Sequence, residues 1–147
     1  MRKIELLSPA GDLERLKYAI MYGADAVYVG GKQFSLRSMA SNFTIEDIKE
    51  GCEFAHQRNA KVYVTCNIVM HENDTNGLLD YLKQLEAAGV DAVIASSPTI
   101  ITLVKSETKM EAHVSTQQSV CNSLGIKFFK ELGADRVVLA RECSMDN

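Results

Sequence analysis

The sequence predicts an α/β fold, the N-terminal portion of a (β/α)8 barrel with about five βα units plus a sixth parallel strand. Three observations lead to this prediction. One short pattern occurs three times, apolar residues at helical spacing precede each copy, and two predicted strands carry polar residues on one face. Unbroken alternation of helices and strands indicates a parallel sheet with right-handed crossovers.

The repeated pattern predicts a joint where a helix ends and a strand begins. Its copies are YGADAVYVG (22–30), AGVDAVIAS (88–96) and LGADRVVLA (132–140). Glycine adopts the left-handed conformation that stops a helix, and the apolar run suits a strand buried on both faces. Asp25, Asp91 and Asp135 follow these glycines at the strand starts, which form the bottom of a barrel. We therefore expect a structural role for the three carboxylates.

The remaining elements follow from local signals along the chain. Strands are expected to begin near Lys3, Asp25, Lys61, Asp91, Met110 and Asp135. Apolar residues at helical spacing occupy the intervals, notably within 13–20, 78–85 and 124–132. Thr44 and Asp47 form a capping-box pattern at the start of one helix. Ser97 followed by Pro98 indicates the N-cap and first residue of another.

The faces of two strands favour a barrel over a doubly wound sheet. In MEAHVSTQ (110–117) one face carries the polar residues and the other the apolar ones: Glu111, His113, Ser115 and Gln117 against Ala112 and Val114. The segment KVYVTCN (61–67) alternates in the same way. A doubly wound sheet is covered by helices on both sides and seldom accepts so many polar residues. In a barrel the mixed face points inward.

Chain length sets the expected domain organisation. A closed barrel usually takes ~250 residues, whereas this chain has 147 and ends directly after the sixth predicted strand. We expect residues 1–147 to be a single incomplete barrel domain, truncated, with the C-terminal part of the architecture absent. The open sheet edge would then be covered by another segment or chain.

Composition excludes several classes of protein. The net charge of −3, from 16 basic and 19 acidic residues, gives no global basic field for nucleic acid, so RNA binding would need a local patch or another domain. No signal peptide or membrane span is evident, which predicts a cytoplasmic protein without a membrane partner. The four cysteines contain no C-x-x-C pair, so neither a disulfide framework nor a metal site is predicted.

Candidate site residues are expected at the carboxyl ends of the strands, where barrel enzymes place their chemistry. His113 is the candidate for catalysis, and the competing interpretation is a buried histidine tied to a neighbouring strand. Ser115 and Gln117, on the same predicted face and nearer the strand end, suit hydrogen bonding to a substrate. Asn67 has the same position on its own strand and is also a substrate-binding candidate.

Two charged residues follow the last predicted strand. Arg141 is a candidate for binding a carboxylate or phosphate of the substrate through two parallel hydrogen bonds. Glu142 is a second catalytic candidate, and the competing interpretation of the adjacent pair is a solvated ion pair. The chain has no G-x-S-x-G elbow and no H-E-x-x-H motif, so a serine or zinc peptidase lacks visible parts.

Four segments together resemble a known family. In the order ELLSPAGDLERLKYAIMYGADAVYVGG (5–31), FSLRSMASNFT (34–44), HVSTQQSVCN (113–122) and LGADRVVLARE (132–142), they are similar to the N-terminal region of peptidase family U32, the collagenase-like proteases. The resemblance implies a TIM-type barrel. It also adds Arg37 and Asn42 to the expected substrate-binding residues, and it favours a functional role for His113.

The resemblance implies two activities of different classes. Some family members are peptidases, and others hydroxylate tRNA wobble uridine, ribosomal RNA or a quinone precursor without molecular oxygen. The first hypothesis is prephenate-dependent 5-hydroxylation of tRNA wobble uridine, with a small carboxylate donor held near Arg37 or Arg141 and tRNA as partner. The alternative is a collagenase-like peptidase acting on a protein or peptide. A second alternative is a non-catalytic scaffold subunit within a hetero- or homo-oligomer.

The same resemblance bears on cofactors. In hydroxylating members the iron–sulfur ligands come from a cysteine-rich signature that lies downstream of the matching region. None of Cys52, Cys66, Cys121 and Cys143 corresponds to those ligands. We therefore expect no cofactor within this chain, and an iron–sulfur cluster in the absent C-terminal part.

Overall fold

The computed structural model describes residues 4–36 and 43–144. Within these ranges the chain forms one sheet of six parallel strands in sequence order. The strands are β1 (Leu7–Pro9), β2 (Ala26–Gly30), β3 (Lys61–Cys66), β4 (Ala92–Ala95), β5 (Glu111–Val114) and β6 (Arg136–Val137). The helices are α1 (Leu13–Met21), α2 (Ile45–His56), α3 (Leu78–Ala87), α4 (Pro98–Glu107) and α5 (Ser123–Glu131), with 3-10 turns η1 (Glu72–Thr75) and η2 (Thr116–Gln118).

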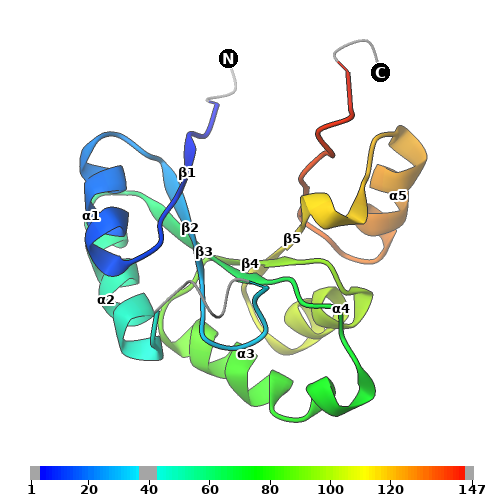
Figure 1. Ribbon diagram of the computed structural model, residues 1–147, viewed down its shortest axis with the longest axis horizontal. Helices are drawn as coiled ribbons and strands as arrows, with labels where there is room; N and C mark the ends of the chain where they lie inside the picture. Colours follow the sequence, from blue (N-terminus) through cyan, green and yellow to red (C-terminus); the bar gives the residue numbers. More distant parts are fainter. Residues whose placement is uncertain (1–3, 37–42, 145–147) are drawn as a thin grey trace.

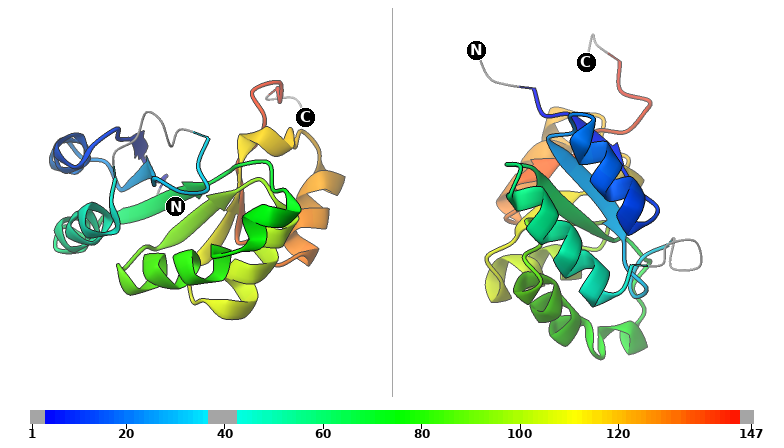
Figure 2. Two further views of the ribbon diagram at one scale, coloured as in Figure 1. Left: turned by 60° about the horizontal axis from the view of Figure 1, so that its bottom comes forward. Right: turned by 90° about the vertical axis from the view of Figure 1, so that its left-hand side faces the viewer.

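The sheet curls into a half-barrel (Figure 1), with the helices on its convex side. In Figure 2 the helices again lie outside the curl, and β1 and the segment that follows β6 stand on opposite sides of the opening. Each strand pairs only with its neighbours in sequence, from β1 to β6. A doubly wound sheet would reverse direction at a switch point. The sequential order therefore confirms the predicted partial barrel.

The three repeated glycines end helices as predicted. Gly23, Gly89 and Gly133 have φ angles of +104°, +92° and +104°, values that L side chains rarely adopt. A Cβ atom built on Gly23 would contact nothing within 4 Å, so conformation alone requires glycine there. The backbone turns sharply at each of these residues and enters the next strand.

The three repeated aspartates connect neighbouring strands. Each carboxylate accepts a hydrogen bond from a main-chain N–H in or just before the preceding strand: Asp25 from Leu6 at 2.9 Å, Asp91 from Val62 at 2.8 Å and Asp135 from Ala112 at 2.9 Å. The same three partners accept, through their carbonyl oxygens, a hydrogen bond from the aspartate's own N–H at 2.9–3.0 Å. The repeat thus joins β1 to β2, β3 to β4 and β5 to β6, which is a structural role, as predicted.

Strand residues alternate between two separate clusters. The outward cluster packs against the helices and includes Val27, Val62, Val64, Val93 and Val114. The inward cluster is smaller and includes Ala26, Tyr28, Tyr63, Ala92 and Ile94. Because the pleat has a period of two, these sets face opposite sides of the sheet. Glu111 and His113 are in register with Ala92 and Ile94 of the inward cluster. The mixed polar and apolar face of β5 therefore points into the barrel, as predicted.

Side chains cap several helix starts. Thr44 and Asp47 form the predicted capping box, with the Thr44 Oγ1 accepting from the Asp47 N–H at 3.1 Å and the Asp47 carboxylate accepting from the Thr44 N–H at 2.9 Å. Pro98 is the first residue of α4, as predicted, but the Ser97 hydroxyl makes no capping hydrogen bond. Capping satisfies donors that would otherwise lack partners at the first turn.

Two strand boundaries differ from prediction. β1 begins at Leu7 rather than near Lys3, and β5 ends at Val114 rather than at Gln117. Ser115 causes the second difference, because its Oγ accepts a hydrogen bond from the Gln117 N–H at 3.4 Å and starts the turn η2. Gln117 therefore leaves the strand, and the prediction that it shares the face of His113 and Ser115 was wrong. No helix within the described ranges combines the length and apolar character that crossing a bilayer requires.

Candidate functional site

A cavity of about 560 Å³ lies at the carboxyl ends of the strands, on the concave side of the sheet. This volume falls within the range of small-molecule binding sites. It is lined by Leu7, Pro9, Ala10, Gly11, Arg15, Tyr28, Gly30, Thr65, Asn67, Ile94, Ser115, Thr116, Val138 and Arg141. The cavity thus occupies the place where barrel enzymes bind their substrates.

Among the described residues, the cavity lining carries positive charge without negative charge. Arg15 comes from the first turn of α1 and Arg141 from the segment after β6, so the two guanidinium groups approach from opposite ends of the sheet. Arg15 is held by the Asp12 carboxylate, with Nη1 2.7 Å from Oδ2. Arg141 is exposed and forms no ion pair with any residue in the described ranges. An anionic ligand would therefore be attracted, and Arg141 is free to bind it.

Short polar side chains provide hydrogen-bonding groups in the cavity wall. Asn67 accepts a hydrogen bond from the Leu36 N–H at its Oδ1, 3.2 Å away, which leaves its Nδ2 group as a donor. Thr65 is bound through its Oγ1 to the Ser35 hydroxyl at 3.0 Å. Ser115 is 5% exposed and lies at the cavity wall. Such a mixture of apolar walls and few polar groups is typical of sites that orient a small organic ligand.

His113 lies in the barrel interior, outside the set of residues that line the cavity. Its side chain is 1% exposed, and its Nε2 is 2.8 Å from the Glu111 Oε2. Its ring packs edge-on against Tyr63, with ring centroids 4.7 Å apart. Burial lowers the pKa of His113, although the hydrogen bond to Glu111 opposes that effect. His113 is therefore a buried histidine held in place by Glu111 and Tyr63. Its catalytic role stays a prediction.

Beside His113 an ionic group joins the two ends of the sheet, with Arg136 in register with His113 on the neighbouring strand. The Arg136 Nη1, on β6, is 2.5 Å from the Oε1 of Glu5, which precedes β1. The Tyr63 hydroxyl donates to the Glu5 Oε2 at 2.9 Å. The hydrogen bond from Arg136 outweighs the effect of burial and lowers the pKa of Glu5. Burial and the hydrogen bond to Glu5 raise the pKa of Tyr63. The group therefore keeps an ionised carboxylate and a neutral phenol.

The structure brings together only part of the predicted site. Asn67, Ser115 and Arg141 line one cavity, although they are far apart in the sequence. Gln117 and Glu142 are exposed and are absent from the cavity lining. Arg37 and Asn42 lie outside the described residues. The functions assigned to all of these residues stay predictions.

Sequence reasoning missed several residues of the cavity and of the group beneath it. Arg15 belongs to a helix that was predicted, but its place in the same cavity as Arg141 depends on the curl of the sheet. Tyr28 and Thr65 could have been predicted as cavity residues, because both occupy inward-facing positions in the alternation of their strands. The partnership of Glu5 with Arg136 had no local signal, because 131 positions separate them.

The four cysteines do not form a cluster-binding set. Cys52 and Cys66 are buried, and burial raises the pKa of each thiol to about 12. Cys121 and Cys143 are partly exposed, with the Cys143 Sγ 3.8 Å from the carbonyl oxygen of Cys121. Within the described ranges no three His, Cys, Asp or Glu side chains are grouped as metal ligands. These residues do not fit the ligand set of an iron–sulfur cluster.

Comparison with known proteins identifies relatives that act on RNA. Over 144 residues the chain is 54% identical to the tRNA hydroxylation protein P1 of Bacillus subtilis (strain 168), covering 97% of this chain and 34% of that protein. It is 39% identical over 144 residues to the 23S rRNA 5-hydroxycytidine C2501 synthase of Escherichia coli (strain K12), covering 98% of this chain and 22% of that protein. The chain thus spans about a third or less of the length of these curated relatives.

Structural and family comparisons agree on the fold. The chain is similar to the solved structure of the U32 peptidase Mk0906, with a TM-score of 0.76 at 15% identity, covering 95% of this chain and 61% of that one. At this identity the similarity supports the fold alone. The family model described as "Peptidase family U32" matches residues 11–147. The chain therefore belongs to peptidase family U32.

Proposed function

We propose that this protein hydroxylates RNA, and that its reaction is the prephenate-dependent 5-hydroxylation of tRNA wobble uridine. The relatives named for tRNA and rRNA hydroxylation support the class of reaction. The observation that carries the proposal for this chain is the cavity, whose described lining residues include two arginines and no carboxylate. A site of that charge suits a small carboxylate and the phosphates of RNA. The tRNA substrate implies a cytoplasmic protein.

The residues of the chain then bind and orient the reactants. Arg141 holds a carboxylate of the prephenate-like donor, since it is exposed to the cavity and has no partner within the described ranges. Ser115 and Asn67 supply hydrogen bonds from the cavity wall. Glu142, His113, Gln117, Arg37 and Asn42 keep the roles proposed from the sequence. Because the cysteines of this chain do not fit an iron–sulfur cluster, we assign the cluster to residues outside 1–147.

A collagenase-like peptidase is the less supported alternative. A serine peptidase needs its serine hydroxyl hydrogen-bonded to a base. Here the Ser115 hydroxyl is bound to Gln117, and the His113 Nε2 is bound to Glu111. No hydrogen bond joins Ser115 to His113 in the described structure. The arrangement therefore lacks the contact that would activate Ser115 as a nucleophile.

Nucleoside analysis of a deletion strain tests the proposal. The gene is deleted in its natural host, and tRNA nucleosides are quantified by mass spectrometry with and without a plasmid copy of the intact gene. We expect 5-hydroxyuridine derivatives to disappear on deletion and to return with the plasmid. Unchanged nucleosides in the deletion strain would reject tRNA hydroxylation. Cleavage of gelatin by the purified intact protein, abolished by Ser115→Ala, would favour the peptidase instead.

A further inference from the structure

Tyr28 provides the aromatic surface of the cavity. Among the described residues that line the cavity, it has the one aromatic side chain. It lies on the inward face of β2, pairs in register with Tyr63 on β3, and is half-buried. Gly30, two positions further on the same face, also lines the cavity and has no side chain to cover the Tyr28 ring. Tyr63, by contrast, is fully buried and bound to Glu5.

Asn67 complements this ring with a directed donor. It follows β3, the strand next to Tyr28, and lines the same cavity. The Leu36 N–H occupies the Asn67 Oδ1 at 3.2 Å and so orients the side-chain amide. The Asn67 Nδ2 is then a donor without a partner in the described part of the chain. A planar ligand with a carbonyl at its edge would satisfy both groups.

We infer that Tyr28 and Asn67 form the subsite for an extruded pyrimidine base, which stacks on the Tyr28 ring and accepts a hydrogen bond from the Asn67 Nδ2 at a ring carbonyl. This inference rests on the proposed function. Enzymes that modify a base take it out of its stack and hold it between aromatic or apolar side chains. Uracil and cytosine share the O2 carbonyl, so the same subsite accepts either base.

The positions of the two arginines agree with this assignment. Arg15 lies beside Gly11, with its Nη1 3.5 Å from where a Gly11 Cβ would be, on the same side of the cavity as β1 and β2. Arg141 lies at the β6 side, where we place the carboxylate donor. The base and the donor therefore enter from different sides of the cavity. Arg15 contacts the phosphate of the bound nucleotide.

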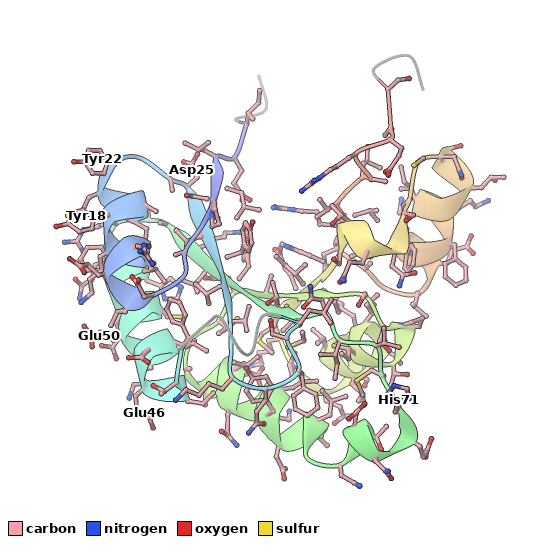
Figure 3. The ribbon with its side chains drawn as sticks, in the orientation of Figure 1. Tyr18, Tyr22, Asp25, Glu46, Glu50 and His71 are labelled. Carbon is pink, nitrogen blue, oxygen red and sulfur yellow. The ribbon has the colours of Figure 1, made fainter. Side chains whose placement is uncertain are left out.

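A purely structural role for Tyr28 makes different predictions. If Tyr28 only filled the core, replacing it with leucine would change stability but not the contribution of the target base to RNA binding. If the ring stacks on the base, replacing Tyr28 with leucine removes the part of the RNA-binding free energy that the target base contributes. The Tyr28→Phe variant keeps the ring, and Asn67→Asp keeps the acceptor for Leu36 while removing the donor. Tyr22→Leu is the matched control, because Tyr22 is 86% exposed on the outer side of α1 (Figure 3).

A binding cycle with two RNAs tests the inference. The intact protein and its variants are titrated with a fluorescently labelled anticodon stem-loop that carries either uridine or an abasic residue at the wobble position. For the wild type, Tyr28→Phe and Tyr22→Leu, we expect the abasic RNA to bind about ten-fold more weakly than the uridine RNA. For Tyr28→Leu the two RNAs should bind equally. Asn67→Asp adds a negative charge that weakens binding of both RNAs, and it should lose several-fold more affinity for the uridine RNA than for the abasic RNA.

The outcomes separate this inference from the proposed function. An undiminished preference for the uridine RNA in Tyr28→Leu, with wobble hydroxylation intact in cells that carry this variant, would overturn the subsite and leave the RNA hydroxylase standing. Failure of the wild-type gene to restore hydroxylation in the deletion strain would remove the proposed function, and the subsite with it. Thermal unfolding of each variant confirms that loss of binding does not reflect loss of folding.

Discussion

The Arg136 guanidinium on β6 binds the carboxylate of Glu5, which lies before β1, and so joins the two ends of an incomplete barrel through its interior. The contact is partly buried, and the Tyr63 hydroxyl adds a second hydrogen bond to Glu5. Removing one partner leaves the other side chain without an opposite charge and without its hydrogen bonds in a partly desolvated site. The contact therefore helps to keep the curl that creates the cavity.

Substitution of Glu5 tests this contact. We expect Glu5→Gln to lower the free energy of unfolding of the intact protein by about 1–3 kcal/mol, measured by urea denaturation. The pKa of Glu5 is lowered in the fold, so its contribution is present above the ordinary glutamate pKa of about 4.3 and is lost as pH falls through the folded value. The difference between wild type and Glu5→Gln should shrink in acid. A constant difference from neutral pH to acid would contradict the ionic origin.

The aspartate repeat makes a second prediction. Asp91 binds the Val62 N–H at 2.8 Å and also lies 3.0 Å from the His56 Nε2. Replacing it with alanine leaves a strand N–H without an acceptor, which costs about 1–3 kcal/mol of unfolding free energy. Glu53→Ala is the control, since Glu53 is an exposed carboxylate on α2. Equal urea midpoints for the two variants would show that the repeated aspartate does not join the strands.

A third prediction concerns Gly23. Its φ of +104° is unfavourable for an L side chain, and a Cβ there would contact nothing within 4 Å. Gly23→Ala should therefore destabilise the protein by about 1–2 kcal/mol through backbone conformation alone. Gly23→Asn should lose less, because asparagine tolerates positive φ better. If alanine and asparagine were both neutral in thermal unfolding, the left-handed helix end would be wrong.

Tyr81 gives a fourth prediction. Tyr81 is 5% exposed, and its buried hydroxyl has no hydrogen-bond partner among the residues that the structure describes. A Cβ built on Gly31 would lie 2.0 Å from that hydroxyl oxygen. Tyr81→Phe removes an unsatisfied polar group, so we expect unfolding free energy to stay the same or rise by about 1 kcal/mol. Tyr81→Phe should also partly rescue Gly31→Ala. A large loss of stability in Tyr81→Phe would reveal a hydroxyl partner and contradict this account.

The parts of the fold with local signals were predictable. Gly23, Gly89 and Gly133 indicated helix ends because glycine readily adopts the left-handed conformation that stops a helix, and the structure has positive φ at all three. Alternation along residues 110–114 assigned His113 to the inward face, which the strand register bears out. Both inferences depend on interactions within a few residues, where sequence pattern and structure are directly linked.

The parts that depend on the curl of the sheet were not predictable. Arg15 lines the same cavity as Arg141 because the sheet is curled, and no pattern near Arg15 encodes that curl. Gln117 lies outside the strand because the Ser115 hydroxyl accepts a hydrogen bond from the Gln117 N–H and starts a turn. Such a side-chain hydrogen bond competes with the strand's backbone hydrogen bonds, and the alternation of polar and apolar residues does not reveal it. Ser115 follows His113 by two residues and lines the cavity, whereas His113 in β5 is buried outside the cavity lining, because the face of a strand does not set depth inside a barrel.

The most direct test of the account is the level of 5-hydroxyuridine derivatives in tRNA when Arg141 is replaced. The deletion strain receives wild type, Arg141→Ala or Arg58→Ala, the last an exposed arginine on the outer side that packs over Phe54. Equal protein levels are verified by immunoblot. We expect Arg141→Ala to reduce the modified nucleosides by about ten-fold or more, through loss of a charged hydrogen bond to the donor, and Arg58→Ala to restore them fully. Full restoration by Arg141→Ala would contradict the cavity as the site of hydroxylation.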